Sequence, residues 1–404
     1  MKNKIITFFT LIVVAGLFFL PSSQQNINEL VFWTLQLGTF DKYINGIISD
    51  FEKQNPDVKI KWVDIPYSEG EKRTLAALLS DNPPDLINLT PDFSAMAAQK
   101  KALFEIPKSA MEAFPESMYP SLSYNGKFFA IPFYLTSAIT FVNSDLLQKS
   151  GIYSLPRTYD DMFSYAENIK NKTGEFVFMP TVSENDTFWK VLDKYDVDIF
   201  SDINSDVSRK IFENYKFLYQ NSLIPKESIT QSHRDALEKY MAGQLVFLQA
   251  GANFLNIVKE NAPSVYENTV LDNQLVGTSG KYDCSMMNLI IPLKAKNKDA
   301  ALKFVLFLTN KDNQLEFSKL TSVLPANKYA LESEYFYQTA TKEDLARKIS
   351  ASQIKNLSDG SKTYRNKKNI ILLLNTTVAQ IMTGKSEVKE SLIKLEKNLA
   401  DFKE

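Results

Sequence analysis

The sequence predicts an α/β protein of two compact domains, with a mainly parallel sheet that helices cover on both faces. The chain has 404 residues, which is too long for one simple core and long enough for two domains. Strand-like and helix-like segments alternate over residues 29–90, a rhythm typical of parallel sheets. Hydrophobic residues make up 44% of the chain and charged residues 23%, which indicates an ordinary globular protein.

The first domain begins with a regular alternation of elements. Strands are expected at 29–34, 58–63 and 85–90, with helices at 40–54 and 69–80 between them. The first helix has apolar residues three and four positions apart, and Asn55-Pro56 ends it. Ligands of such sheets bind beyond the carboxyl ends of the strands, which here are residues 33–36, 66–67 and 90–93.

The remainder of the chain is richer in helix. Thr158 and Asp161 form a capping-box pattern, which predicts a helix over 159–171. Strands are expected at 176–180 and 244–249. Further helices are expected at 185–192, 208–220, 234–242, 298–309 and 312–320, and a largely helical tail at 332–404.

The N-terminus has the pattern of an export signal. Lys2 and Lys4 precede an apolar run over 5–20, and a polar break follows, so residues 1–25 are interpreted as a signal peptide. No A-x-A cleavage site follows the run, which keeps an uncleaved N-terminal anchor as the alternative. No Cys follows it, which excludes lipid attachment at an N-terminal cysteine.

The composition excludes several classes of protein. A formal charge of −1 gives no field to attract nucleic acid or an anionic membrane. One Cys (Cys284) and one His (His233, expected on an exposed helix) leave no disulfide, zinc site or His-based triad, and no phosphate-binding glycine loop occurs. We therefore expect no catalytic residues, no metal and no cofactor. A glycosidase remains an alternative, because a carboxylate pair is a three-dimensional feature.

Six segments in order resemble the family 1 extracellular solute-binding proteins of ABC transporters, the group that includes the maltose-binding type. Among them are Gly126-Lys-Phe-Phe-Ala-Ile-Pro132, Leu155-Pro-Arg-Thr-Tyr-Asp-Asp161 and Asn82-Pro-Pro-Asp-Leu-Ile87. The six lie at residues 67–87, 126–132, 141–151, 155–161, 241–251 and 297–325.

The resemblance implies a two-lobe periplasmic-binding-protein fold of type II, each lobe a mainly parallel sheet flanked by helices. Lobe I would comprise residues 26–136 and 286–325, and lobe II residues 137–285 and 326–404. The chain would cross between the lobes three times, at 136–138, 282–287 and 324–328. Closure about these crossings is the expected motion.

The resemblance also implies a function. The protein would bind a carbohydrate in the interlobe cleft, close over it, and deliver it to the permease subunits of an ABC importer, without performing chemistry. It would act as a monomer in the periplasm or on the outer face of the cytoplasmic membrane. Aromatic rings would stack on the sugar and polar groups would bind its hydroxyls. The stacking candidates are Trp33, Tyr67, Tyr134, Trp189, Phe254 and Tyr282, and the polar candidates are Gln36, Asp92, Asn253 and Asp283.

Two departures from the family pattern keep another ligand open. Gly251-Ala-Asn-Phe254 lacks the Trp that many sugar-binding members have there, and Gly280-Lys-Tyr-Asp283 replaces a Gly-Gly pair. Trp33 and Tyr134 could equally be core residues. A receptor of the same fold for a non-sugar solute is the alternative, and several carboxylates with few aromatic faces in the cleft would favour it.

Overall fold

The computed structural model describes residues 28–357 and 366–402. The expected signal peptide or anchor at 1–25 lies outside these residues. In the part of the chain that is described, no helix is both long and apolar enough to cross a membrane.

The N-terminal alternation is confirmed. Strands β1 (Asn28–Leu35), β2 (Val58–Ile65) and β3 (Leu86–Leu89) alternate with helices α2 (Asp41–Gln54) and α3 (Tyr67–Leu79). β1 pairs in parallel with both β2 and β3. Helix α2 buries Ile44, Ile47, Ile48 and Phe51, the apolar stripe that its spacing predicts.

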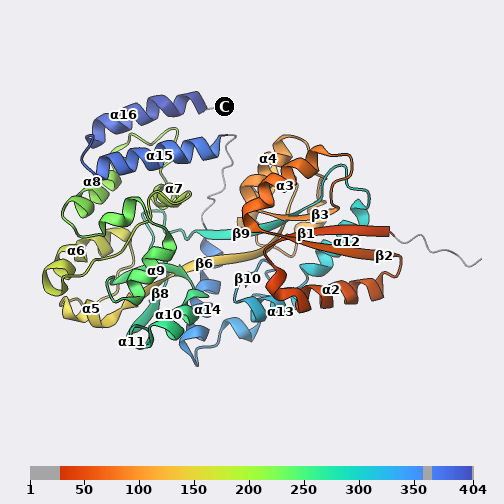
Figure 1. Ribbon diagram of the computed structural model, residues 1–404, viewed down its shortest axis with the longest axis horizontal. Helices are drawn as coiled ribbons and strands as arrows, with labels where there is room; N and C mark the ends of the chain where they lie inside the picture. Colours follow the sequence, from red (N-terminus) through yellow and green to blue (C-terminus); the bar gives the residue numbers. More distant parts are fainter. Residues whose placement is uncertain (1–27, 358–365, 403–404) are drawn as a thin grey trace, which may run out of the picture.

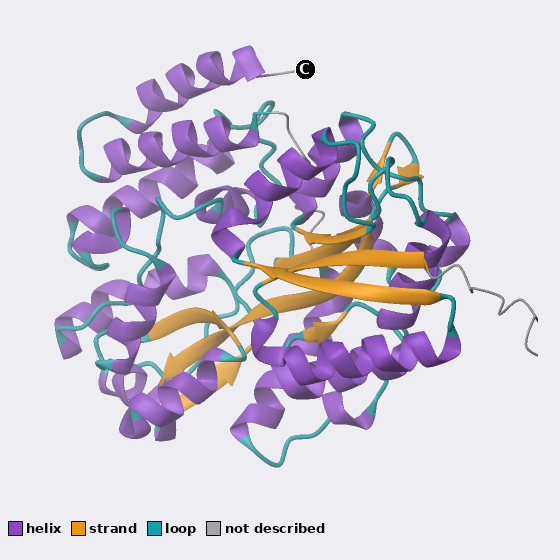
Figure 2. Ribbon diagram, turned by 45° about the vertical axis from the view of Figure 1, so that its right-hand side comes forward, coloured by secondary structure: helices purple, strands orange, loops and turns teal. Residues whose placement is uncertain are grey.

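One mixed sheet runs through the whole molecule (Figure 2). Its order is β10-β6-β9-β3-β1-β2, and two further strands pair with β6. Among the named strands of this sheet, only the pairs that β1 makes with β2 and β3 are parallel, and the other pairs are antiparallel. The expectation of a mainly parallel sheet in each lobe is therefore wrong for lobe II. The added strands are β6 (Ile131–Asn143), β7 (Phe247–Gly251), β8 (Thr269–Asp272), β9 (Cys284–Ile290) and β10 (Leu324–Pro325).

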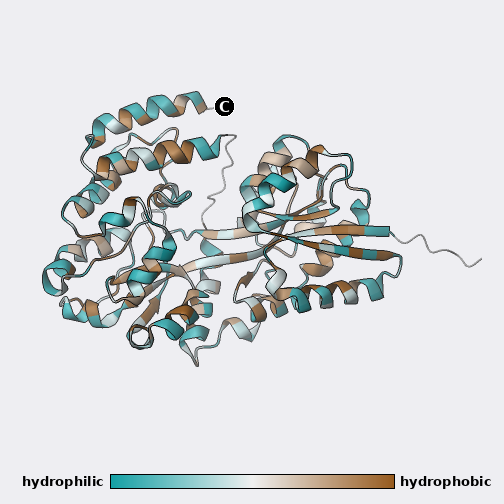
Figure 3. Ribbon diagram, viewed as in Figure 1, coloured by the Kyte–Doolittle hydropathy of each residue, from teal (hydrophilic) through white to brown (hydrophobic). Residues whose placement is uncertain are grey.

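Two lobes form around separate cores, with β6 and β9 running between them (Figure 1). The first half of β6, from Ile131 to Leu135, packs in the core of lobe I, and Ile139 to Val142 pack in the cores of lobe II. Apolar residues concentrate on the strands and on the inner helix faces (Figure 3). Lobe I also contains α4 (Pro91–Gln99), α12 (Lys298–Leu308) and α13 (Lys311–Thr321).

Lobe II is mostly helical. Its helices are α5 (Ser144–Lys149), α6 (Tyr159–Thr173), α7 (Thr187–Asp193), α8 (Asp206–Gln220), α9 (His233–Met241), α10 (Phe254–Asn261), α11 (Pro263–Glu267), α14 (Lys342–Gln353), α15 (Lys367–Met382) and α16 (Val388–Leu399). The strand expected at 176–180 is wrong: Phe176 forms an isolated bridge with Leu245, and the backbone hydrogen bonds to the 244–247 segment involve only Phe176 and Val177.

The first expected crossing lies in the middle of β6. Thr136 and Ser137 pair with Ser285 and Cys284 of β9, and Ala138 pairs with Gly251 of β7. The lobe boundaries remain predictions. The burial of Ala326 and Phe336 in the core of lobe I favours a third crossing that lies later than 324–328.

Candidate functional site

Two adjoining cavities lie where β6 and β9 pass between the lobes. The interlobe cavity has a volume of about 240 Å³ and receives side chains from both lobes. The inner cavity, of about 360 Å³, lies mainly within lobe II. Thr136, Lys190, Asp283, Cys284 and Ser285 line both, so the two cavities share one wall.

Lobe I presents Tyr67 and Asp92 to the interlobe cavity. Tyr67 is the first residue of α3, directly beyond β2, and Asp92 lies in the first turn of α4, directly beyond β3. Both positions are at the carboxyl ends of parallel strands, where this kind of sheet places its ligands. Tyr67 is 55% exposed, which leaves its ring available to a ligand.

Tyr134 of β6 forms another part of this wall. Its ring lies edge-on to Phe133 at a centroid distance of 5.1 Å, and Phe317 packs against it. Burial, with smaller contributions from Tyr67 and Asp64, raises the pKa of Tyr134 to about 12. Tyr134 therefore stays a neutral phenol that can donate and accept hydrogen bonds.

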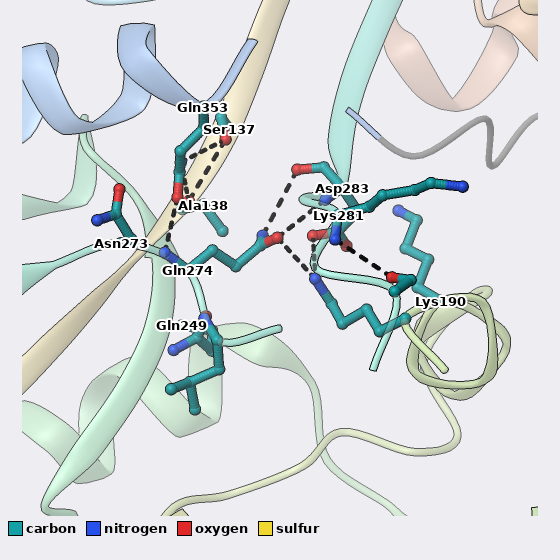
Figure 4. Close-up of polar contacts among 12 residues, drawn as sticks. Ser137, Ala138, Lys190, Gln249, Asn273, Gln274, Lys281, Asp283 and Gln353 are labelled. Atoms are coloured by element: carbon teal, nitrogen blue, oxygen red, sulfur yellow. Dashed lines mark hydrogen bonds and ion pairs between the residues drawn. The ribbon is translucent and has the colours of Figure 1, made fainter. Parts of the chain in front are cut away.

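Asp283 of the shared wall forms a hydrogen-bonded charge pair with Lys194, which lines the inner cavity. Figure 4 shows Asp283 beside Gln274. Lys194 Nζ lies 2.7 Å from Gln274 Oε1 and 3.1 Å from Asp283 Oδ1. The Asp283 amide donates to the same Gln274 oxygen at 2.9 Å. Burial acts to raise the pKa of Asp283, but the positive charges of Lys194 and Lys190 outweigh it and lower that pKa below its ordinary value. Asp283 is therefore a fixed negative charge beside the cavities.

Lys190 of α7 supplies a positive charge to both cavities. Its Nζ lies 3.3 Å from Asp186 Oδ1. Burial alone would lower the pKa of Lys190, whereas Asp186 and Asp283 together raise it. Beside it, burial raises the pKa of the Cys284 thiol to about 12, so this thiol stays protonated.

The polar end of the inner cavity is formed by His233 and Gln249. His233 Nε2 lies 2.8 Å from the Gln249 carbonyl oxygen, and its ring meets that of Phe254 edge-on at 5.4 Å. Gln249 Nε2 donates to Thr140 Oγ1 at 2.7 Å. The expectation that His233 is a surface residue is wrong, because α9 begins at this residue and directs it toward β7.

The structure brings six of the ten predicted site residues to the cavities. Tyr67, Asp92 and Tyr134 line the interlobe cavity, Asn253 and Phe254 line the inner one, and Asp283 lines both. Their contact with a ligand remains a prediction.

The other four do not line either cavity. Trp33 packs against Leu35, Ile65 and Met287. Trp189 is 7% exposed and belongs to the core of lobe II. Gln36 is exposed beyond β1 with a left-handed φ of 54°. The Tyr282 amide donates to the Asn356 carbonyl at 2.9 Å, which ties this segment to the 3-10 turn Ile354–Asn356 that follows α14.

Several polar residues at the cavities were not expected from the sequence. Asp186, Lys190 and Lys194 are spaced by four, which places them on one side of a helical segment and is the one local signal that could have found them. Gln274 and Lys367 come from distant segments, and no local pattern marks them. Across residues 28–357 and 366–402, no group of three His, Cys, Asp or Glu side chains could hold a metal ion.

The cavities therefore offer charges of both signs, amide groups and a few aromatic rings. Such a surface can bind a polyhydroxylated molecule, because charged groups form strong hydrogen bonds with hydroxyls.

Residues 46–344 match the profile of a family described as bacterial extracellular solute-binding protein. The diacetylchitobiose binding protein DasA of Streptomyces coelicolor is 22% identical over 328 residues, which cover 75% of this chain and 74% of that protein. The arabinooligosaccharide-binding protein of Bacillus subtilis is 23% identical over 248 residues, covering 56% of this chain and 57% of that one.

Solved structures show the same fold. A protein from Synechococcus sp. MITs9220, provisionally described as an oligosaccharide periplasmic-binding protein, superposes with a TM-score of 0.81 at 28% identity, covering 93% of this chain and 100% of that chain. The sugar-binding protein MalE from Xanthomonas citri superposes with a TM-score of 0.79 at 19% identity, covering 93% and 97% of the two chains.

Proposed function

Because this chain belongs to the bacterial extracellular solute-binding proteins, we propose that it binds a carbohydrate between its lobes and delivers it to the permease of an ABC importer. The family is extracellular or periplasmic, and the expected resemblance and two-lobe fold are confirmed. Our proposal goes further in three respects: the ligand is a mono- or oligosaccharide, the protein acts as a monomer, and it performs no chemistry.

The observation that carries this proposal is that both lobes contribute residues to the interlobe cavity. Tyr67 and Asp92 come from lobe I, Lys190 and Lys367 come from lobe II, and β6 and β9 run beneath them. A ligand that contacts both sets gains its full contacts only when the lobes are close together. Binding would therefore favour closure, which is the signal that a permease can recognise.

The chemistry of the cavity suits hydroxyl groups. The exposed ring of Tyr67 can cover an apolar sugar face, and Asp92, Asp283 and Lys190 can bind hydroxyls at the rim. The names of two relatives state that they bind diacetylchitobiose and arabino-oligosaccharides, which supports an oligosaccharide here.

A second candidate, a receptor of the same fold for a non-sugar solute such as a polyamine, is favoured by one observation. Asp92, Asp186, Asp193 and Asp283 all line the interlobe cavity, with Tyr67 and Tyr134 as its aromatic residues. An exported glycosidase is the third candidate, since such an enzyme needs two carboxyl groups in one cleft and this cavity contains several.

A thermal-shift screen separates the candidates. The protein from residue 26 onward is heated with mono- and oligosaccharides, polyamines and amino acids in turn. A ligand of the folded state at a hundredfold excess over its Kd stabilises it by about 2.7 kcal/mol. We expect stabilisation by a sugar; a response only to polyamines would support the second candidate. Appearance of shorter sugars during incubation, followed by chromatography, would support the third.

A substitution at Tyr67 then tests whether the ligand binds in the interlobe cavity. Tyr67→Ala should weaken binding of the identified sugar roughly tenfold, or about 1.4 kcal/mol, because the ring loses its stacking contact. Tyr153→Ala is the matched control, since Tyr153 is 84% exposed and lies outside both cavities. Calorimetric titration of both variants gives the result, and equal affinities would contradict a ligand on Tyr67.

A further inference from the structure

Helix α15 connects the core of lobe II to the edge of the cleft. Its buried face packs Ile370, Leu374 and Val378 into that core. Its first two residues, Lys367 and Lys368, lie at the end that faces α3 and α4 of lobe I (Figure 1).

These two lysines form ion pairs across the cleft. Lys367 Nζ lies 2.9 and 2.8 Å from the two carboxylate oxygens of Asp92, in the first turn of α4. Lys368 Nζ lies 2.5 Å from Glu71 Oε2 of α3. The paired residues are 275 and 297 positions apart in the chain, and each pair joins lobe II to lobe I. We call these two ion pairs the interlobe latch.

Lobe II holds Lys367 in position for this contact. Its Nζ also lies 3.6 Å from Asp186 Oδ2, and 5.8 Å from the ring centroid of Trp189. The side chain of Lys367 is only 13% exposed, so its charge is less screened than that of a surface lysine. Asp92 is 45% exposed, so this pair is half-buried, whereas Lys368 and Glu71 are 85% and 46% exposed and form a surface pair. The Lys367–Asp92 pair should therefore supply most of the stabilisation.

The position of the two lysines at the start of α15 makes their ion pairs with lobe I more favourable. The N-terminal end of a helix carries a partial positive charge, and cations in the first turn are unfavourable there. α15 has two lysines at its start and no acidic residue in its first turn. Asp92 and Glu71 of lobe I offset this repulsion, but only while the lobes are close together.

We propose that Lys367 and Lys368 form an electrostatic latch that favours the closed arrangement of the lobes independently of any ligand. Opening the cleft separates both ion pairs; Lys368 then loses Glu71, and Lys367 keeps only the longer contact with Asp186 of its own lobe. The latch thereby sets the balance between open and closed protein, and with it the fraction of molecules that is already arranged as the ligand requires.

The test measures lobe separation in the absence of any ligand. Dyes are placed at Leu79→Cys in α3 and Ile393→Cys in α16, which are 76% and 48% exposed in the two lobes. Cys284 is partly buried, and the raised pKa of its thiol keeps it from reacting; labelling the parent protein checks this. Single-molecule energy transfer then gives the populations of the closed and open forms.

The double substitution Lys367→Met with Lys368→Met should lower the ratio of closed to open protein roughly tenfold at low salt, equivalent to about 1.4 kcal/mol. In the parent protein, raising the ionic strength should shift the same ratio in the same direction, and the double variant should respond far less. Lys127→Met is the control, because it removes the Lys127–Glu105 pair at 2.6 Å, which lies within lobe I.

A charge exchange keeps the test independent of folding defects. Glu71→Lys alone should open the cleft by repulsion from Lys368, and adding Lys368→Glu should restore the closed fraction. Unchanged populations in the double lysine variant, or failure of the exchanged pair to restore closure, would overturn the latch. Because no ligand is used, this result stands apart from the identity of the solute.

Discussion

The Lys194 ammonium is the most thoroughly buried charge beside the cavities, with its side chain 3% exposed. A buried charge is tolerated when it is paired and hydrogen-bonded, and Gln274 and Asp283 provide both conditions. Lys194→Met removes the cation and leaves the Asp283 carboxylate without its partner. We expect the free energy of unfolding to fall by about 3 kcal/mol. This value is at the low end of the losses seen when a buried ion pair is broken, because Asp283 is 24% exposed. Urea unfolding measures it.

The matched control is again Lys127→Met, whose ion pair with Glu105 has both side chains more than half exposed, at 58% and 52%. Such pairs contribute at most about 1 kcal/mol. Equal losses in the two variants would show that burial of Lys194 contributes nothing.

The lowered pKa of Asp283 predicts a dependence of stability on pH. Burial opposes ionisation, but Lys194 and Lys190 prevail, so the folded carboxyl has a lower pKa than the unfolded one. A group of this kind stabilises the fold above its unfolded pKa, near 3.9, and that contribution is lost as the pH falls through the folded pKa. Asp283→Asn should therefore be destabilised relative to the parent protein at pH 6. The difference between them, measured by urea unfolding at each pH, should shrink from about pH 5 downward. A difference that does not vary with pH would contradict the assignment.

At the scale of elements, α6 is a helix whose start depends on a local motif. Thr158 Oγ1 accepts from the Asp161 amide at 3.0 Å, and Asp161 Oδ2 accepts from the Thr158 amide at 3.0 Å. Thr158→Ala should cost about 1 kcal/mol of unfolding free energy, because it leaves a helix N–H without its acceptor. Thr158→Ser retains the hydroxyl and should recover most of the loss in the same urea measurement. A Ser variant as unstable as the Ala variant would show that the methyl group, not the cap, matters.

This capping box was predictable because Thr158 and Asp161 are three positions apart, and their hydrogen bonds do not depend on any residue elsewhere in the chain. The strand expected at 176–180 was not formed, since a strand also requires a partner along its whole length, and residues 244–247 bond to the backbone of Phe176 and Val177 only. Side-chain direction is a similar case. The sequence identifies Trp189 as an aromatic residue on a helix, but only the packing of α7 against lobe II decides that it faces the core while Lys190 faces the cavity.

The two-lobe fold was predictable because six motifs in order resemble a family whose members share that fold. The candidate site was only partly predictable. Tyr67 and Asp92 follow strand ends, a rule that the sequence alone can apply. Gln274 and Lys367 reach the cavities from segments whose position depends on the complete tertiary structure.

At the scale of the whole molecule, the shared strand β6 couples the stability of the lobes. Its residues Ile131 to Leu135 fill the core of lobe I, and Ile139 to Val142 fill the cores of lobe II. β7 and β8 both pair with the second half of β6, so unfolding of lobe I would destabilise the strand on which the sheet of lobe II is assembled. We therefore expect the two lobes to unfold together.

Differential scanning calorimetry tests this expectation. A single transition is predicted, with a ratio of calorimetric to van't Hoff enthalpy close to one. Thr158→Ala lies in lobe II and Phe304→Leu removes buried volume in the core of lobe I, so each should move the whole transition without splitting it. Two resolved transitions, with each substitution shifting only one, would show that β6 does not transmit stability between the lobes. A single transition would mean that a ligand in the interlobe cavity stabilises the entire molecule.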